Sequence, residues 1–383
     1  MYFLNNKTAQ IDDLLARAAE KLQLDKTRRE KIESSYKSVQ EVLENDPDFF
    51  NTKNFEIYPQ GSVRIGTTVK PLSKNEFDLD IVLHIQNRVY EQIDPLKVFN
   101  ELKRVLQGNG NYKEKVEPKT RCVRLNYAGD YHMDILPGCQ HSADDENKIV
   151  IPDRKLKEWL ISNPRGYAEW FLNKAETVTR TLLEKAYAAE EIPSDDFAAK
   201  KPLQRAVQII KRYRDIFFEE SPDYATSSIV LTTLAGQLYQ NQESIFETID
   251  SIISQINSQV SLSRLRRIKV LNPVDNDEDF TDKWEREPKY YSEFIRFVES
   301  LYLNWQKLKE DNGIVEESNI LKSVIGENIY SDSVKQQTLL TEDYRKKGKV
   351  FSSSVTGAIG SKVVSDKPVK KIHFLESEKI LEK

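Results

Sequence analysis

The stretch over residues 60–85 restricts what this chain can fold into more than any other part of it. Within it, Asp78 and Asp80 are separated by one apolar residue, in a run where acidic and apolar side chains alternate. Side chains along a β-strand alternate between its two faces, so both carboxylates project from one face and the apolar residues point into a core. Carboxylates about 7 Å apart repel each other unless a cation lies between them. The pair therefore predicts a Mg²⁺ site, because Mg²⁺ prefers hard oxygen ligands and leaves room for substrate phosphates.

A glycine–serine pair lies upstream of the two acids. Gly61 lets the backbone approach a phosphate closely, and Ser62 adds a hydroxyl donor directly after it. Ser62 precedes Asp78 by 16 residues, and a Gly-Ser pair followed at this distance by Asp-x-Asp resembles the signature of the polymerase-β-like nucleotidyltransferases. An Asp-x-Asp alone is weak, because half-exposed strands often carry alternating acids. The combination is much more specific.

A third acid lies further along the chain. The pattern of residues 120–137 predicts a hairpin with its turn at 128–130. In the second arm, Met133 and Ile135 point to one face and Asp134 points to the other. If this arm lies beside the strand of the first two acids, three carboxylates meet on adjacent strands, as a two-metal phosphoryl-transfer site requires.

Composition excludes several classes of protein. The chain has 383 residues, of which 31% are charged, and a net charge of −4, which argues against a surface that coats nucleic acid. Two cysteines and four histidines leave no disulfide framework and no zinc-spaced cluster. No apolar run reaches transmembrane length and the N-terminus lacks a signal-peptide layout, so we expect a cytoplasmic protein without a membrane partner.

Hydrophobic periodicity divides the chain into four parts. A helical stripe covers residues 8–43, with a break or a kink at 24–26 left open, and from residue 156 to about 340 the pattern is helical. Beyond residue 344 periodicity is lost and a serine run with scattered Lys and Gly predicts a mobile tail. We therefore expect an N-terminal helical spine at 1–50, a nucleotidyltransferase catalytic core at 51–155, a helical lobe at 156–343 that closes the active site, and a tail at 344–383.

The helical part offers further candidates for binding. An amphipathic helix is predicted over residues 203–218, where Lys211 belongs to a separate polar stripe. Ser227 and Ser228 precede an apolar helix over 229–239, and either hydroxyl could cap that helix. By themselves these residues indicate only a solvated lysine and a helix cap.

Taken together, the motifs resemble those of the bacterial cGAS/DncV-like nucleotidyltransferases, or CD-NTases, of the CBASS antiphage systems. The resemblance covers roughly residues 8–340 and depends most on Tyr-Pro-Gln-Gly-Ser at 58–62, Phe-Asp-Leu-Asp-Ile-Val at 77–82 and His-Met-Asp-Ile-Leu-Pro at 132–137. CCA-adding enzymes, poly(A) polymerases and antibiotic adenylyltransferases share the Gly-Ser and Asp-x-Asp motifs. The segments at 203–215 and 228–234, and Asn272-Pro273 with Phe280 and Trp284, narrow the resemblance.

The resemblance implies an α+β fold, with a polymerase-β-like core sheet and a helical C-terminal lobe that together form a bilobed cage. It implies an enzyme that links nucleoside triphosphates into a cyclic di- or trinucleotide, which we expect to contain adenine. Two Mg²⁺ ions, with Mn²⁺ as the alternative, are implied as cofactors. The implied catalytic and metal-binding residues are Asp78, Asp80 and Asp134. The implied nucleotide-binding residues are Gln60, Gly61, Ser62, Lys211 and Ser228, with Ser227 as the alternative to Ser228.

Expected partners are ATP and a second nucleotide of unknown base, a downstream effector that acts through the product, and a regulatory partner protein. The zinc-binding and basic features of the animal relatives are absent from the sequence, so activation by duplex DNA is not expected. Two other functions compete with cyclase activity. One is template-independent nucleotidyl transfer to RNA or protein, and the other is a catalytically silent scaffold that binds nucleotide.

Overall fold

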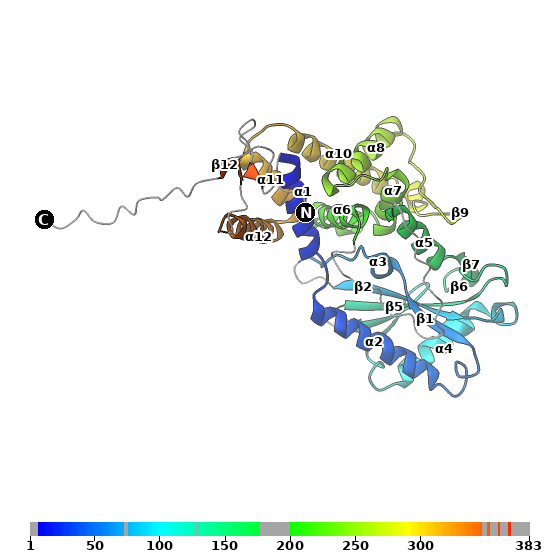
Figure 1. Cartoon of the computed structure of the whole chain (residues 1–383). Coiled ribbons are helices and arrows are strands. Elements are labelled where there is room, and N and C mark those ends of the chain that lie inside the picture. Colours follow the sequence, from blue (N-terminus) through cyan, green and yellow to red (C-terminus); the bar gives the residue numbers. More distant parts are fainter. Residues whose placement is uncertain are drawn as a thin grey trace.

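A mixed seven-stranded sheet forms the first lobe of the protein (Figure 1). The computed structural model describes residues 7–72, 76–127, 129, 131–176 and 200–346, and the short segments 351–352, 359–360 and 367–368. The strand order is β1-β2-β5-β4-β3, and β6 joins the far end of β5 and pairs with β7. The strands are β1 (Phe55–Pro59), β2 (Phe77–Ile85), β3 (Val116–Pro118), β4 (Val123–Tyr127), β5 (Tyr131–Gln140), β6 (Ile149–Asp153) and β7 (Glu158–Ser162).

Strands β2 and β5 pair in parallel, and their register places Asp80 directly opposite Asp134. The predicted hairpin is present as the antiparallel pair β4 and β5. The pairing of β2 with β5 confirms that the hairpin arm carrying Asp134 lies beside the strand of the first two acids. The three acids therefore occupy two neighbouring strands of one sheet.

One face of this sheet is covered by α2 (Lys26–Glu44) and α4 (Pro95–Gly108). The apolar residues of β2 that alternate with the acids, Phe77, Leu79 and Ile81, are buried in the core beneath these helices. Alternation along the strand therefore directs Asp78 and Asp80 to the opposite face.

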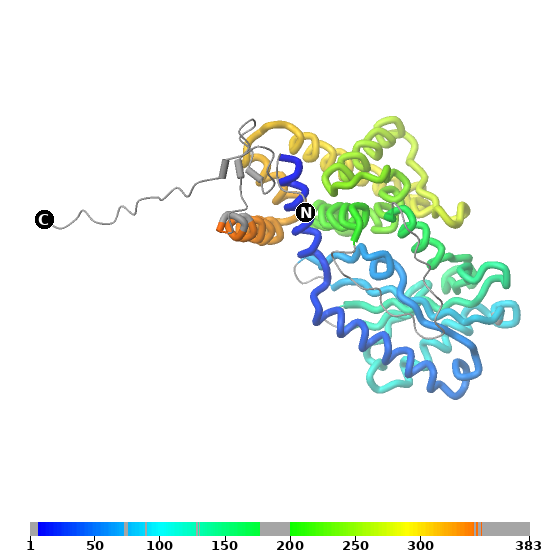
Figure 2. The backbone as a smooth tube through the Cα atoms, viewed as in Figure 1, coloured from blue at the N-terminus to red at the C-terminus, as the bar shows by residue number. Residues whose placement is uncertain are grey.

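The N-terminal helical stripe is two helices, which settles the open question at residues 24–26. The first, α1 (Lys7–Lys21), ends before Asp25, whose side chain caps α2 by accepting a hydrogen bond from the Arg28 amide at 2.9 Å. Helix α1 packs in the core of the helical lobe, while α2 packs on the sheet. Figure 2 shows this blue segment passing from one lobe to the other.

Helix α6 runs through the second lobe and packs against α1, α7, α8 and α11. The helices of this lobe are α5 (Pro164–Ala175), α6 (Pro202–Phe217), α7 (Ser228–Leu238), α8 (Ile245–Leu262), α9 (Lys283–Arg286), α10 (Lys289–Lys309), α11 (Ile314–Ile325) and α12 (Glu327–Lys346). None of the helices in the described ranges is long and apolar enough to cross a membrane.

The expectation of a purely helical pattern after residue 156 is wrong in two places. Strand β7 continues the sheet because it pairs with β6 along its whole length, and backbone pairing of this kind is decided by neighbours in space. A second departure is the small hairpin of β8 (Leu271–Asn272) and β9 (Asp275–Asp279). The expected tail starts inside α12, which continues to Lys346.

Beyond α12 the described residues form a small sheet of β10 (Phe351–Ser352), β11 (Ile359–Gly360) and β12 (Lys367–Pro368). The remainder of the expected mobile tail lies outside the described residues. The overall α+β architecture, a sheet lobe with a helical lobe beside it, agrees with the expected fold class.

Candidate active site

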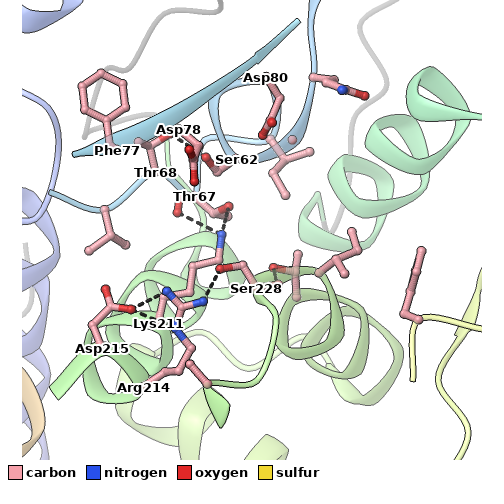
Figure 3. Close-up of a pocket in the computed structure, with 18 of the residues that line it drawn as sticks. Ser62, Thr67, Thr68, Phe77, Asp78, Asp80, Lys211, Arg214, Asp215 and Ser228 are labelled. Atoms are coloured by element: carbon pink, nitrogen blue, oxygen red, sulfur yellow. Dashed lines mark hydrogen bonds and ion pairs between the residues drawn. The ribbon is translucent and has the colours of Figure 1, made fainter. Parts of the chain in front are cut away.

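A cavity of about 890 Å³ lies between the two lobes (Figure 3). Its walls come from β2, α3 (Gly61–Arg64) and the following loop on one side, and from α5, α6, α7 and β9 on the other. This volume is in the upper part of the range of small-molecule pockets, which is about 300–1,000 Å³. Seven of the eight residues predicted to act in catalysis or nucleotide binding line it: Gln60, Gly61, Ser62, Asp78, Asp80, Lys211 and Ser228.

Asp134 is the eighth, and it is not among the residues that line the cavity. Arg124 donates two hydrogen bonds to the Asp134 carboxylate, each 2.7 Å long, and a third to Asp78 at 3.1 Å. Arg124 stands on β4 directly opposite Asp134 on β5. This arginine therefore orients the third acid and connects it to the first one.

The acids influence one another electrostatically. Burial, followed by the nearby carboxylates of Asp134 and Asp78, raises the pKa of Asp80 to about 7. So high a pKa means that too little positive charge surrounds the ionised carboxylate of Asp80. A divalent cation bound beside it would supply that charge and favour the ionised form.

The carboxylate oxygens of Asp78 and Asp80 suit a hard cation such as Mg²⁺, but they supply only part of its coordination shell. Among the described residues, no group of three or more His, Cys, Asp or Glu side chains converges on one ion position. Protein Mg²⁺ sites commonly use one or two carboxylates and complete the shell with water and substrate phosphates. Asp78 and Asp80 are the residues that would hold the ion at the cavity wall.

The chain passes very close to Asp80 at the start of α3. Gly61 has a φ of +59°, and a Cβ atom placed on it would lie 2.6 Å from Asp80 Oδ2. Both the backbone conformation and this approach require glycine. Ser62 follows with its hydroxyl in the cavity, where it accepts a hydrogen bond from Thr68 at 3.3 Å. The backbone N–H of Gln60 donates a hydrogen bond of 2.9 Å to the backbone carbonyl of Asp80. This bond holds the end of β1 against β2 just before the turn.

Lys211 extends from α6 toward the sheet lobe, as Figure 3 shows. Its ammonium donates to the Thr67 hydroxyl at 3.0 Å and to the Thr67 carbonyl at 3.3 Å. Burial, and then the positive charge of Arg214, lowers the pKa of Lys211 to about 7. An anionic phosphate beside it would restore the charged form. The solvated-lysine interpretation does not apply, because the side chain is buried.

The rest of the polar stripe on α6 holds the loop after α3. Gln204 donates to the Ile65 carbonyl at 2.9 Å, and Gln208 donates to the Thr68 carbonyl at 2.7 Å. Side chains of one helix thus anchor the loop that follows the Gly-Ser turn. This contact sets the position of one lobe relative to the other.

The structure distinguishes the two candidate serines. Ser228 lines the cavity, and its hydroxyl accepts a hydrogen bond of 2.7 Å from Arg214. Ser227 is the N-cap residue of α7, but its side chain makes no capping hydrogen bond. Arg214 also pairs with Asp215, and both of these residues line the cavity beside Ser228 (Figure 3).

Arg124 and Arg214 were not predicted from the sequence. A signal for Arg124 was available, because a hairpin with its turn at 128–130 places residue 124 opposite residue 134. Arg214 gave no such signal, because its partner in the cavity, Ser228, lies at the start of another helix. The hairpin residues Asn272 and Glu278 also line the cavity unexpectedly.

The sequence and structure resemble those of characterised proteins. Residues 10–174 match the family model "Second Messenger Oligonucleotide or Dinucleotide Synthetase domain". The chain is 41% identical over 372 residues to a protein of Roseivirga ehrenbergii named "c-di-GMP synthase", and the match covers 97% of each chain. It is 24% identical to "Cyclic dinucleotide synthase CdnG" of Bradyrhizobium diazoefficiens, over 92% of this chain and 91% of the relative.

The solved structure of the CD-NTase CdnG from B. diazoefficiens, in complex with GTP, has the same fold. It superposes with a TM-score of 0.70 at 22% identity, covering 86% of this chain and 99% of that one. The polymerase-β-like architecture expected from the motifs is thereby confirmed.

Proposed function

This chain belongs to the bacterial CD-NTases, and we propose that it joins two molecules of GTP into a cyclic dinucleotide. As a member of that family it is a nucleotidyltransferase of the cyclic dinucleotide synthase type. The chain shares 41% sequence identity with a protein named "c-di-GMP synthase" over 97% of its length. This similarity supports guanine as the base of both nucleotides. The name of that relative favours guanine over the expected adenine, and the assay described below tests both bases.

One observation carries the proposal. A single cavity combines Ser62, Asp78 and Asp80 from the sheet lobe with Lys211 and Ser228 from the helical lobe. Phosphoryl transfer depends on positioning and on charge neutralisation, and it needs little covalent chemistry from the protein. The cavity offers acids on one wall and cations with hydroxyls on the other, which suits a triphosphate held between the lobes.

Each residue has a role in this proposal. The backbone at Gly61 and the Ser62 hydroxyl contact the donor triphosphate, and Lys211 and Ser228 contact it from the opposite lobe. A ribose hydroxyl of the second nucleotide attacks the α-phosphorus, so that a new P–O bond forms and pyrophosphate leaves. A second such step closes the ring. Bound Mg²⁺ would neutralise phosphate charge and lower the pKa of the attacking hydroxyl.

The experiment is a product assay on the purified full-length chain. We expect GTP with Mg²⁺ to yield a phosphatase-resistant product with the mass of a cyclic dinucleotide, because a ring has no terminal phosphate. ATP alone and an equimolar mixture of ATP and GTP test the adenine alternative. Linear, phosphatase-sensitive products would indicate nucleotidyl transfer to another acceptor, and the absence of any product would indicate a silent scaffold.

We further propose that the product acts on a downstream effector in antiphage defence, as the resemblance to CBASS enzymes implies. The test compares phage plaque numbers on cells that carry the native operon with those on cells whose operon encodes Asp78→Asn and Asp80→Asn. Protection that survives the double substitution would contradict signalling through the product.

A further inference from the structure

One wall of the cavity has no part in the chemistry described above. It is formed by Asn272 on β8, by Glu278 and Phe280 on and after β9, and by Tyr167 on α5. These residues come from the helical lobe and bring a carboxylate, an amide and two aromatic rings into the nucleotide cavity. The proposed chemistry gives none of these four residues a role, so this wall is available for another part of the substrate.

The carboxylate of Glu278 is held by a fixed partner. Asn272 donates a hydrogen bond of 2.7 Å to Glu278 Oε2. The Asn272 oxygen accepts from the backbone amide of Val274 at 3.1 Å, so its amide nitrogen has to point toward the glutamate. Asn272 is itself buried, with 3% of its surface exposed. This arrangement positions Glu278 without using both of its oxygens.

Within the described residues, Glu278 Oε1 has no hydrogen-bond or ion-pair partner. Burial, opposed by the bond from Asn272, raises the pKa of Glu278 above its usual range. A partly buried carboxylate in this condition lacks donors, and a ligand that brought two of them would favour its ionised form.

Aromatic rings lie beside this carboxylate. The rings of Phe280 and Tyr167 meet edge to face, with centroids 6.1 Å apart and an interplanar angle of 81°. Tyr167 is fixed by a hydrogen bond of 2.9 Å between its hydroxyl and that of Thr233. An aromatic surface next to a hydrogen-bonding edge is the combination that recognises a nucleobase by its face and its edge together.

Among the purines, guanine matches this wall and adenine does not. Guanine presents the N1–H and a 2-amino N–H side by side, and one carboxylate can accept both in a bidentate pair, because Oε2 keeps a second lone pair beside the bond from Asn272. Adenine has an acceptor at N1 and no amino group at C2. The lone pair of its N1 would therefore face the lone pairs of the carboxylate. Sites built to bond a particular donor reject analogues that lack it far more strongly than apolar pockets do.

We infer that Glu278 reads the Watson–Crick edge of a guanine base in this cavity, positioned by Asn272 and with Phe280 forming part of the surface for the base. The inference rests on the proposed function, since it names the feature that selects GTP as a substrate. It assigns a specificity role to a hairpin that lies outside the motifs shared by nucleotidyltransferases.

The test compares GTP with ITP, which keeps N1–H and lacks the 2-amino group. We expect the wild-type protein to bind GTP at least about tenfold more tightly than ITP, as a matched bidentate contact allows. Glu278→Gln should bring this ratio close to one, because a glutamine can accept only one of the two donors. Affinities are measured by calorimetry on the full chain, and kcat/KM for both nucleotides is measured in the product assay.

Asp277→Asn is the matched control, because Asp277 lies on the same strand, is exposed and does not line the cavity. It should keep the wild-type ratio of GTP to ITP affinity. If Glu278→Gln does not fold, Glu278→Asp serves instead, since it retracts the carboxylate by one methylene and should also lower the ratio.

An unchanged ratio in a folded Glu278 variant would overturn the inference, and it would leave the proposed function intact if cyclic guanine product still formed. If the wild-type protein forms no guanine product, the proposed function fails. The ratio of affinities then decides the role of Glu278 independently: a preference for GTP that disappears in the variant upholds guanine reading, and any other result overturns it.

Discussion

At the scale of single residues, the cavity contains buried ionisable side chains that have too few oppositely charged groups around them. Asp80 is close enough to two other carboxylates to be affected by their charge, and Lys211 is a buried amine whose hydrogen bonds go to Thr67. Both have pKa values displaced to about 7, in opposite directions. Groups of this kind destabilise the fold slightly and are characteristic of functional sites, where the substrate supplies the missing charges.

The double substitution Asp78→Asn with Asp80→Asn should abolish product formation while the fold survives. The two carboxylates share one face of β2, and removing their charges removes both the ligands for a cation and their mutual repulsion. Cyclic product is measured by mass spectrometry, and folding is measured by the melting temperature in EDTA. Asp277→Asn is the control for a loss of acidic charge elsewhere. Product formation at the wild-type rate would refute the assignment of the two acids.

Among elements, α6 determines how the two lobes meet. Gln204 and Gln208 hold the loop after the Gly-Ser turn, one turn of the helix apart, and Lys211 continues the same stripe into the cavity. A helix that anchors the loop before the acids also carries the cation that we propose to contact phosphate. We therefore expect the polar stripe of this helix to serve phosphate binding as well as the packing of the two lobes.

Replacing Lys211 with alanine should raise the KM for GTP by at least about tenfold and change kcat less. A phosphate contact made equally in the ground state and the transition state contributes uniform binding. Initial rates over a range of GTP concentrations separate the two constants. Lys309→Ala, which removes an exposed lysine paired with Asp250 on the outer helices, should leave both unchanged. If Lys211→Ala alters only the melting temperature, the lysine serves packing alone.

A second connection between elements joins β1 to α5. Glu56 on β1 accepts a hydrogen bond from Arg165 at 2.6 Å and interacts with His84 at 3.0 Å. Burial would raise the pKa of Glu56, but the bonds from His84 and Arg165 outweigh it and lower this pKa to about 2. The ionised carboxylate thus stabilises the folded state.

Glu56→Gln should lower the free energy of unfolding by about 1–3 kcal/mol at pH 7, the usual contribution of hydrogen bonds to a charged group. Because the pKa is about 2 in the folded state and 4.5 as the reference value, the stabilisation is complete above pH 4.5 and disappears as the pH falls toward 2. Urea unfolding at pH 7 and pH 3 measures it, with Glu158→Gln on the exposed part of β7 as control. A difference that did not shrink at low pH would mean that the charge of Glu56 is irrelevant.

For the whole molecule, the described residues that line the cavity all lie within the first 280 residues. Its lining extends from Gln60 to Phe280, and α10, α11 and α12 pack behind it. Helix α12 still contributes to the fold, because Gln337 donates to the Gln10 carbonyl and to Asp13 on α1 at 3.1 and 3.0 Å. The chain therefore has to include α12, while the segment after it lies away from the cavity lining.

Truncation after Lys346 should preserve cyclase turnover within about tenfold, because no residue beyond this point lines the cavity in the described part of the chain. The same truncation should weaken any contact with a regulatory partner. The measurement is kcat for GTP with truncated and full-length protein under identical Mg²⁺. A larger loss, more than about 1.4 kcal/mol of barrier, would mean that the tail belongs to the active fold.

The sequence by itself was sufficient for the features that depend on local periodicity. Alternation along β2 was enough to place Asp78 and Asp80 on one face, and the spacing on α6 was enough to predict its apolar face. The burial of the polar stripe on α6 was not predictable in this way. The hairpin that carries Asp134 was predictable from the turn residues at 128–130 between two alternating segments. These features follow from the chain's own stereochemistry, so neighbours in space do not alter them.

Only the tertiary structure decided which distant segments meet. The sheet position of β7 depends on its pairing with β6, and the choice of Ser228 over Ser227 depends on the approach of Arg214 from another helix. The position of Glu278 in the cavity wall is decided in the same way, by the packing of a short hairpin and the Phe280 that follows it against α5. Contacts between remote residues depend on the free energy of the whole packed chain, and no local spacing in the sequence records that quantity.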